Sequence, residues 1–201
     1  MISTTMHDYR AFAAAAARRP ALVGACAPSS RRLGDLLATV VPGTGAPVVA
    51  ELGPGTGSVS HAIAARLPAA GTHLAVELDP ALAAHLRARL PGITVVEGDA
   101  ADLGPLLATA GLSDVDAVVS GLPWALFPPE QQRRTLAAIA GCLPADGAFS
   151  TFTYRHTGLL SAARRFRRLL HEHFDQVVCT RTVWRNLPPA FAYVCHRPLC
   201  A

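Results

Sequence analysis

The stretch Val48-Val-Ala-Glu51-Leu-Gly53-Pro-Gly55-Thr-Gly57 decides the fold of this chain. Its apolar start, residues 48–52, predicts a buried strand, and the spacing of apolar residues over 59–67 predicts a helix. The glycines between them permit a tight turn and a close approach of the backbone to a nucleotide-like ligand. Such a loop alone can be an ordinary turn, but its place between a strand and a helix is the context that ligand binding requires.

Beyond this loop, short apolar runs alternate with longer helical patterns. This alternation predicts an α/β fold, with a mostly parallel sheet covered by helices on both faces. The last two strands have no helix between them, which predicts an antiparallel hairpin at one edge of a seven-stranded sheet. The expected strands are 48–52, 73–78, 93–97, 115–119, 148–154, 177–183 and 191–195, and the expected helices are 59–67, 80–90, 102–110, 130–143 and 159–174. Helices over 9–18 and 31–40, separated by a loop over 20–30, are expected before the glycine loop.

Two carboxylates follow the next strands at their carboxyl ends, where open sheets of this kind bind ligands. Glu77, in Val76-Glu-Leu78-Asp79, is placed to accept hydrogen bonds from both hydroxyls of a ribose. Asp79 competes for that role, but the proline after it favours a helix cap. Asp99, followed by Ala100, is placed to accept from the exocyclic amine of adenine, or it is a capping aspartate.

The fourth strand ends in Ser120-Gly121-Leu122-Pro123-Trp124, a further candidate site segment. A nicotinamide oxidoreductase is the alternative for the glycine loop. Such enzymes carry G-x-G-x-x-G, whereas here the third glycine comes one position earlier and residue 58 is serine. They also need no second acidic site after the third strand, so the sequence favours another adenosine-bearing cofactor.

These motifs resemble those of the class I methyltransferases, which use S-adenosylmethionine. Residues 51–57 are similar to the first motif of that class, residues 77–79 to the second and residues 98–100 to the third, and the resemblance covers residues 47–197. It implies a Rossmann-like fold and a role for the glycine loop in holding the methionine part of the cofactor. The cofactor-binding residues expected on this basis are Glu51, Gly53, Gly55, Gly57, Glu77, Leu78, Asp99, Ala100 and Ser120.

Two groups within the class are more similar still. The segment Val23-Gly-Ala-Cys-Ala-Pro28-Ser-Ser-Arg-Arg-Leu33 resembles the V-G-A-x-x-P-S-S-R-x-L entry of bacterial phospholipid N-methyltransferases, and residues 120–123 resemble their S-G-L-P. Ribosomal RNA adenine dimethylases share the E-x-G-P-G loop but carry N-L-P-Y, whose asparagine holds the adenine amine. Gly121 stands at that position here and cannot make the contact. Trp124 departs from the phospholipid enzymes, which usually have an aliphatic residue there.

Methyl transfer requires in-line placement of an amine lone pair and the methyl group, with neither a metal nor a covalent intermediate. The backbone of Ser120, Gly121 and Leu122 is expected to accept from the amine, and Tyr154 and His156 are candidate bases. Trp124 and Tyr154 are candidates for an aromatic wall around a methylated ammonium. Arg155 is a candidate for a phosphate. The alternatives are a packing role for Trp124 and solvated side chains for Tyr154 and Arg155.

Composition bounds the remaining predictions. The chain has 201 residues, 51% hydrophobic, with a net charge of +4 and no apolar run long enough to span a bilayer. No dense basic tract or separate binding domain points to nucleic acid. Five scattered cysteines favour free thiols in a reducing compartment. We expect a monomer in the cytoplasm, with peripheral contact at the inner membrane face.

The expected division is an N-terminal helical segment, 1–46, acting as a lid or membrane contact, and a cofactor-binding domain, 47–201. The basic amphipathic pattern over 159–174 is compatible with an anionic membrane surface or with an ordinary helix that covers the sheet. The first functional hypothesis is N-methylation of the phosphatidylethanolamine headgroup. The others are N- or O-methylation of a soluble small molecule, methylation of RNA adenine, and a cofactor-binding protein without catalysis.

Overall fold

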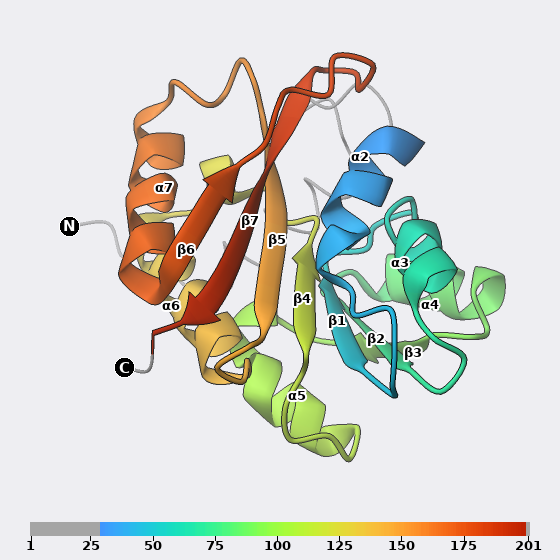
Figure 1. The fold of residues 1–201 in the computed structure, drawn as a ribbon. Helices are drawn as coiled ribbons and strands as arrows, with labels where there is room; N and C mark the ends of the chain where they lie inside the picture. Colours follow the sequence, from blue (N-terminus) through green and yellow to red (C-terminus); the bar gives the residue numbers. More distant parts are fainter. Residues whose placement is uncertain (1–28, 200–201) are drawn as a thin grey trace.

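A seven-stranded sheet forms the centre of the computed structural model, which describes residues 29–199. The strand order is β3-β2-β1-β4-β5-β7-β6 (Figure 1). β1 to β5 run parallel to one another, and β7 runs antiparallel to both β5 and β6. The strands are β1 (Val48–Leu52), β2 (Thr72–Glu77), β3 (Thr94–Glu97), β4 (Ala117–Ser120), β5 (Ala148–Tyr154), β6 (Phe174–Cys179) and β7 (Ala190–Pro198).

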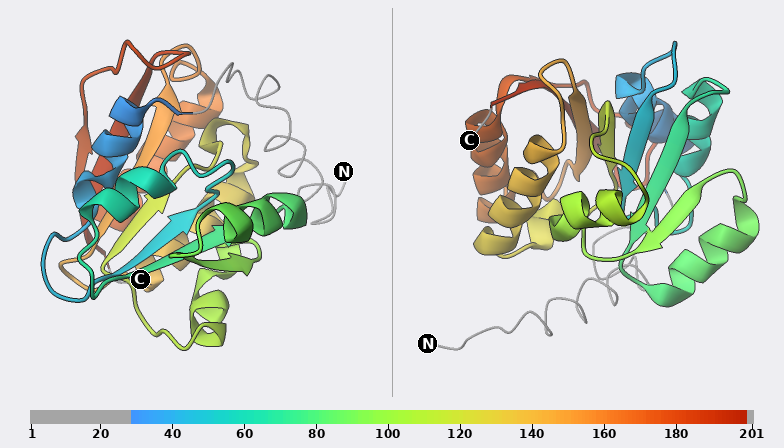
Figure 2. Two further views of the ribbon diagram at one scale, coloured as in Figure 1. Left: turned by 90° about the vertical axis from the view of Figure 1, so that its right-hand side faces the viewer. Right: turned by 90° about the horizontal axis from the view of Figure 1, so that it is seen from below.

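Helices cover both faces of this sheet, as the two views of Figure 2 show. The α-helices are α2 (Arg31–Leu37), α3 (Ser60–Arg66), α4 (Pro80–Arg89), α5 (Leu103–Thr109), α6 (Pro129–Gly141) and α7 (Ser161–His173). Short 3₁₀ turns are η2 (Ala38–Val40), η3 (Ala100–Asp102) and η4 (Trp124–Leu126). Side chains alternate between the faces of a strand, so β1 supplies Val49 to the core under α2 and α3 and Leu52 to the core under α5, α6 and α7.

The fold predicted from the sequence is confirmed, including the antiparallel hairpin at the edge. Boundaries differ at the edge of the sheet: β6 begins at Phe174, directly from α7, and ends at Cys179, whereas the sequence predicted a strand over 177–183. Phe174 is fully buried and stacks on Phe149 of β5, so its packing takes it into the strand. β7 also continues to Pro198, opposite Phe174, past the expected end at residue 195. The helix expected over 9–18 and most of the loop over 20–30 lie outside the described residues.

Pairing of the parallel strands brings their carboxyl ends to one edge of the sheet. Leu52 of β1 lies opposite Val76 of β2 and Ser120 of β4, and Glu77 lies opposite Glu97. The loops after β1, β2, β3 and β4 therefore meet at this edge. In the part of the chain that the structure describes, no helix has both the length and the apolar character needed to cross a bilayer.

Candidate active site

The glycine loop after β1 has the conformation that its sequence predicts. Gly53, Gly55 and Gly57 have φ angles of 67°, 57° and 84°, a region that residues with a side chain rarely adopt. The amide of Gly53 donates to the carbonyl of Val76, which fixes the loop against β2. A Cβ atom on Gly57 would lie 3.1 Å from Leu90. A Cβ atom on Gly55 would have nothing within 4 Å, so the loop is open there to a ligand at close range.

A second glycine contact joins this loop to the segment after β4. A Cβ atom on Gly121 would lie only 2.6 Å from the carbonyl oxygen of Gly53. The amide of Gly121 donates to the carbonyl of Leu52 over 2.8 Å. Any larger residue at 121 would displace backbone, so the asparagine of the N-L-P-Y motif has no room in this arrangement. Gly121 therefore brings the segment after β4 directly against the glycine loop.

Glu77 is a buried carboxylate at the end of β2. Its Oε2 accepts from the amide of Gly55 and its Oε1 from the amide of Asp79, each over 3.0 Å. Burial raises the pKa of Glu77, although these amide donors oppose the shift. Each carboxylate oxygen keeps a second lone pair with which to accept from a ribose hydroxyl. Asp79 caps α4 instead, accepting from the amides of Ala81 and Leu82.

Asp99 is buried just after β3 and has one oxygen without a partner. Its Oδ1 accepts from the amide of Ala101 at 3.0 Å and from Nε2 of Gln131 at 3.3 Å. Its Oδ2 is buried and accepts from none of the described residues. Buried acceptors without a partner are rare in proteins, so this oxygen points to a ligand donor such as an adenine amine. Gln131 also contacts Thr135, which orients it toward Asp99.

Glu51 is placed within the sheet. Its Oε2 lies 3.0 Å from Nε2 of His73, and both side chains are almost fully buried. Glu51 Oε1 and His73 Nδ1 find no partner among the described residues. The pair holds β1 against β2 just before the glycine loop. A direct contact of Glu51 with the cofactor remains a prediction. Leu78 and Ala100 follow Glu77 and Asp99, half-buried and buried respectively.

A small apolar pocket of about 70 Å³ opens beside Gly121. One water needs roughly 10–15 Å³ by the same kind of measure, so the pocket admits a group of a few heavy atoms. The pocket is lined by residues 121–126, Phe152, Thr153, Tyr154 and Thr157. Within the described residues, the carbonyl of Gly121 accepts no hydrogen bond. A residue whose carbonyl has no partner among the described residues therefore lines an apolar pocket next to the glycine loop.

Trp124 shapes this pocket from the core side. Its ring is 1% exposed, stacks on Phe166 at 4.4 Å and donates through its indole N–H to Ser120 Oγ. Ser120 Oγ also accepts from the amide of Leu122, so a fully buried serine fixes the whole turn. The packing alternative for Trp124 accounts for these contacts. We expect Trp124 to set the depth of the pocket, while Ser120 acts through the turn that it holds.

Tyr154 lies at the pocket wall, at the end of β5. Its half-exposed ring lies 5.8 Å from His156, nearly parallel to it, and at right angles to Phe152. His156 is exposed. Arg155 points elsewhere, with its guanidinium 5.0 Å from the centre of the Trp184 ring. The structure thus brings Tyr154 to the pocket, whereas Arg155 is not among the residues that line it.

Four residues of the candidate site were not predicted from the sequence. Gln131 orients Asp99, Gln132 donates to the carbonyl of Trp124 at 2.7 Å, His73 pairs with Glu51, and Phe152 lines the pocket. For Gln131 and Gln132, the sequence offers one signal, which is that two glutamines stand side by side in the first turns of α6. Both are buried, whereas polar residues of an amphipathic helix usually face the solvent.

The residues fit S-adenosylmethionine. The glycine loop leaves room for the methionine part, Glu77 has acceptor capacity for the ribose, and the unpartnered oxygen of Asp99 suits the adenine amine. Among residues 29–199, no group of three or more His, Cys, Asp or Glu side chains is arranged to hold a metal ion.

Comparisons with known proteins agree with this geometry. A family model described as a methyltransferase domain matches residues 49–147. The chain is 34% identical over 193 residues to an ornithine lipid N-methyltransferase of Singulisphaera acidiphila, covering 94% of this chain and 96% of that one.

Solved structures share the fold. An O-methyltransferase from Bacillus cereus, in complex with SAH, has a TM-score of 0.67 at 14% identity and covers 97% of this chain and 93% of its own. A precorrin-6y C5,15-methyltransferase from Geobacter metallireducens has a TM-score of 0.60 at 18% identity, covering 83% and 88%. The cofactor is S-adenosylmethionine, and the chain belongs to the class I S-adenosylmethionine-dependent methyltransferases.

Proposed function

We propose that this enzyme methylates the primary amine in the headgroup of a membrane lipid. The observation that carries the proposal is the apolar pocket beside the glycine loop, which is lined by Gly121, a residue whose carbonyl lacks a partner among the described residues. An ammonium group there donates one hydrogen bond to that carbonyl, and its methylated products are held by apolar walls. The similarity to an ornithine lipid N-methyltransferase over nearly the full length supports a lipid acceptor.

The reaction needs a neutral amine placed in line with the methyl group. S-adenosylmethionine supplies an electrophilic methyl carbon bonded to a sulfonium. The amine nitrogen forms the new N–C bond, the C–S bond breaks, and its electron pair remains on sulfur in S-adenosylhomocysteine. The Gly121 carbonyl and the turn fixed by Ser120 orient the lone pair, while Phe152 and Leu122 keep water out.

Proton removal needs no strong base in the pocket. An ammonium that enters an apolar site loses solvation, so its pKa falls and the neutral amine becomes accessible. Tyr154, which lines the pocket, and the His156 ring stacked on it are the groups that we propose to pass that proton to solvent. The aromatic rings of Tyr154 and Phe152 then stabilise a methylated ammonium by cation–π contact.

Two headgroups share the required chemistry. Phosphatidylethanolamine offers a primary amine and a phosphate, and it is the headgroup that the sequence resemblance favours. An ornithine-bearing lipid offers a primary amine and a carboxylate, and the named relative favours it. Either anion suits an arginine near the pocket, and Arg155, which follows the pocket residue Tyr154 in the sequence, is the candidate.

The test is a headgroup series. The purified enzyme is incubated with methyl-labelled S-adenosylmethionine and detergent micelles that contain phosphatidylethanolamine, ornithine lipid or, as the control, phosphatidylglycerol, which has no amine. Label in mono-, di- or trimethylated forms of either amine lipid supports the proposal and shows which headgroup is used. Labelling only of added soluble amines or phenols, or of an RNA adenine, would overturn it.

A further inference from the structure

Exposed apolar side chains gather in two loops at the site end of the molecule. Among the described residues, six large hydrophobic side chains are exposed, and four of them lie in the β5–α7 loop, 155–160, and the β6–β7 loop, 180–189. These four are Leu159 (80% exposed), Leu160 (48%), Trp184 (66%) and Leu187 (64%). We call the two loops together the loop rim. Figure 1 shows both at the top of the view, the orange and the orange-red loop.

The loop rim is held in place by specific contacts. The amide of Arg155 donates to the carbonyl of Pro189 at 2.8 Å, which joins the two loops. The buried side chain of Asn186 donates to the carbonyl of Pro188 and accepts from the amide of Ser30 at 2.8 Å. The loop that carries Trp184 and Leu187 is therefore fixed at both sides while these two side chains remain exposed.

Positive charge surrounds the exposed apolar groups. Arg155, Arg181 and Arg185 are exposed, and none of them pairs with a carboxylate in the described part of the chain. After Asp146 the sequence contains eight arginines and only two acidic residues, Glu172 and Asp175. The two acidic residues lie at the end of α7 and the start of β6, away from the rim.

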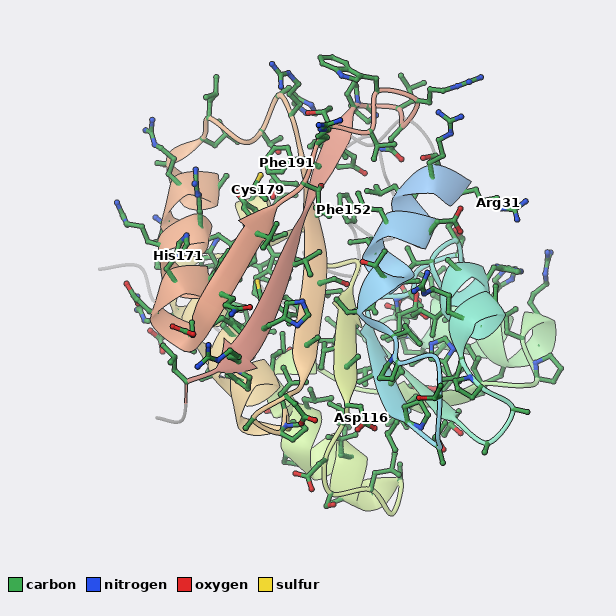
Figure 3. All side chains as sticks on the ribbon, viewed as in Figure 1. Arg31, Asp116, Phe152, His171, Cys179 and Phe191 are labelled. Carbon is green, nitrogen blue, oxygen red and sulfur yellow. The ribbon has the colours of Figure 1, made fainter. Side chains whose placement is uncertain are left out.

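The loop rim continues directly from the apolar pocket beside Gly121. Tyr154 and Thr157 line the pocket, and Arg155 between them belongs to the rim. Gly158 of the rim lies against Phe191, since a Cβ atom on Gly158 would be 3.5 Å from its ring. Figure 3 shows Phe191 at the upper end of the sheet and Asp116 at the opposite end. A flat surface seated on the rim would therefore contact the same chain segment that supplies Tyr154 and Thr157 to the pocket.

We propose that the loop rim docks this enzyme on an anionic phospholipid bilayer. Leu159, Leu160, Trp184 and Leu187 enter the interface, where tryptophan is favoured, and the arginines meet lipid phosphates. The choice of a membrane rests on charge complementarity, on apolar side chains presented by fixed loops, and on the proposed lipid acceptor. A second copy of the chain, or residues 1–28, would be the other occupants.

Trp184 reports directly on this docking. The chain has two tryptophans; Trp124 is buried, and Trp184 is 66% exposed. The full-length protein is mixed with vesicles of phosphatidylglycerol and phosphatidylcholine, which contain no primary amine. We expect the emission to shift to the blue and to be quenched by brominated acyl chains. Trp184→Phe should abolish the shift but leave the emission of Trp124.

Matched variants locate the binding surface. The double substitution Leu159→Ser and Leu160→Ser is expected to weaken vesicle partitioning about tenfold or more. Leu199→Ser, which removes an exposed leucine at the opposite end of β7, should leave it unchanged. Arg185→Gln is expected to weaken it about fivefold at low salt, and Arg89→Gln, an exposed arginine of α4, should not.

The outcomes separate the docking proposal from the proposed reaction. Vesicle binding that fails on rim variants, while turnover on micellar lipid persists, supports docking. Equal binding of rim and control variants overturns it, as does a Trp184 spectrum that vesicles do not change. The proposal is also overturned if Trp184 is already shielded from acrylamide in the protein without vesicles. In that case, exposure of the ring on dilution would assign the rim to contact with a second copy, and continued shielding would assign it to contact with residues 1–28. Rim-dependent binding without lipid methylation refutes only the reaction.

Discussion

The substitution Asp99→Asn isolates the assignment of the adenine site. Asp99 is 4% exposed; its Oδ1 accepts from the amide of Ala101, and its Oδ2 has no partner among the described residues. Asparagine has the same shape and keeps the Oδ1 contact. It replaces the free oxygen with an NH₂ group, a donor that faces the donor on adenine.

The expected loss follows from the chemistry of that oxygen. A hydrogen bond to a charged acceptor contributes about 1.5–3 kcal/mol, so affinity for S-adenosylmethionine should fall roughly 10- to 150-fold. Folding of the cofactor-free protein should not suffer, because the substitution also removes a buried charge that lacks a partner at Oδ2. We expect its melting temperature to be unchanged or higher.

Calorimetric titration with S-adenosylhomocysteine and thermal melts measure the two effects separately. Asp102→Asn is the matched control, since Asp102 lies in the same turn but pairs with Arg134 on a half-exposed surface. It should alter affinity less than about twofold, within the usual effect of an exposed ion pair. Equal affinity of Asp99→Asn and wild type would refute the adenine assignment. A drop in affinity matched by loss of folding would refute the reasoning on the free oxygen.

Three further substitutions test the rest of the site. Gly121→Ala should weaken cofactor binding at least about tenfold and cost about 1–3 kcal/mol of stability, because the new Cβ meets the Gly53 carbonyl. Gly141→Ala is the control: its Cβ would have nothing within 4 Å, so it should not lower stability. Calorimetry and urea denaturation measure both. Burial raises the pKa of Glu77 above 4.5, so the affinity for the cofactor should fall as acidification protonates this carboxylate. Calorimetry across pH should show that Glu77→Gln flattens this pH dependence. The stability of the cofactor-free protein should depend on pH in the opposite direction. Because the pKa of Glu77 is raised in the folded state, stability is lost as the pH rises through that pKa, and thermal melts across pH measure this loss. Trp124→Phe should cost about 1–2 kcal/mol in urea denaturation by losing the indole hydrogen bond to a buried serine, and lower kcat in methyl-transfer assays by loosening the turn.

The fold could be predicted because its signals are local. Buried parallel strands are continuous apolar runs. The glycines at 53, 55 and 57 stand out in the sequence by their spacing between a strand and a helix, and all three adopt a positive φ. Glu77 and Asp99 could be placed because Glu77 ends β2 and Asp99 comes two residues after β3, and parallel pairing alone brings strand ends together.

Contacts between distant segments could not be predicted. Gln131 reaches Asp99 across 32 positions, and Gly121 meets Gly53 across 68, with no pattern in either segment that marks the pairing. The role of Trp124 depends on Phe166, which α7 brings beneath it. The start of β6 at Phe174 likewise depends on an aromatic stack with β5, which no helix-ending signal marks in the sequence.

The most direct test of the central claim is a one-tube competition. The enzyme receives deuteromethyl S-adenosylmethionine together with phosphatidylethanolamine, ornithine lipid and free ethanolamine, and mass spectrometry locates the label. The account predicts label on the amine nitrogen of a lipid, absent from free ethanolamine and strongly reduced in Gly121→Ala. Label on free ethanolamine at an equal rate, or on oxygen, would contradict it.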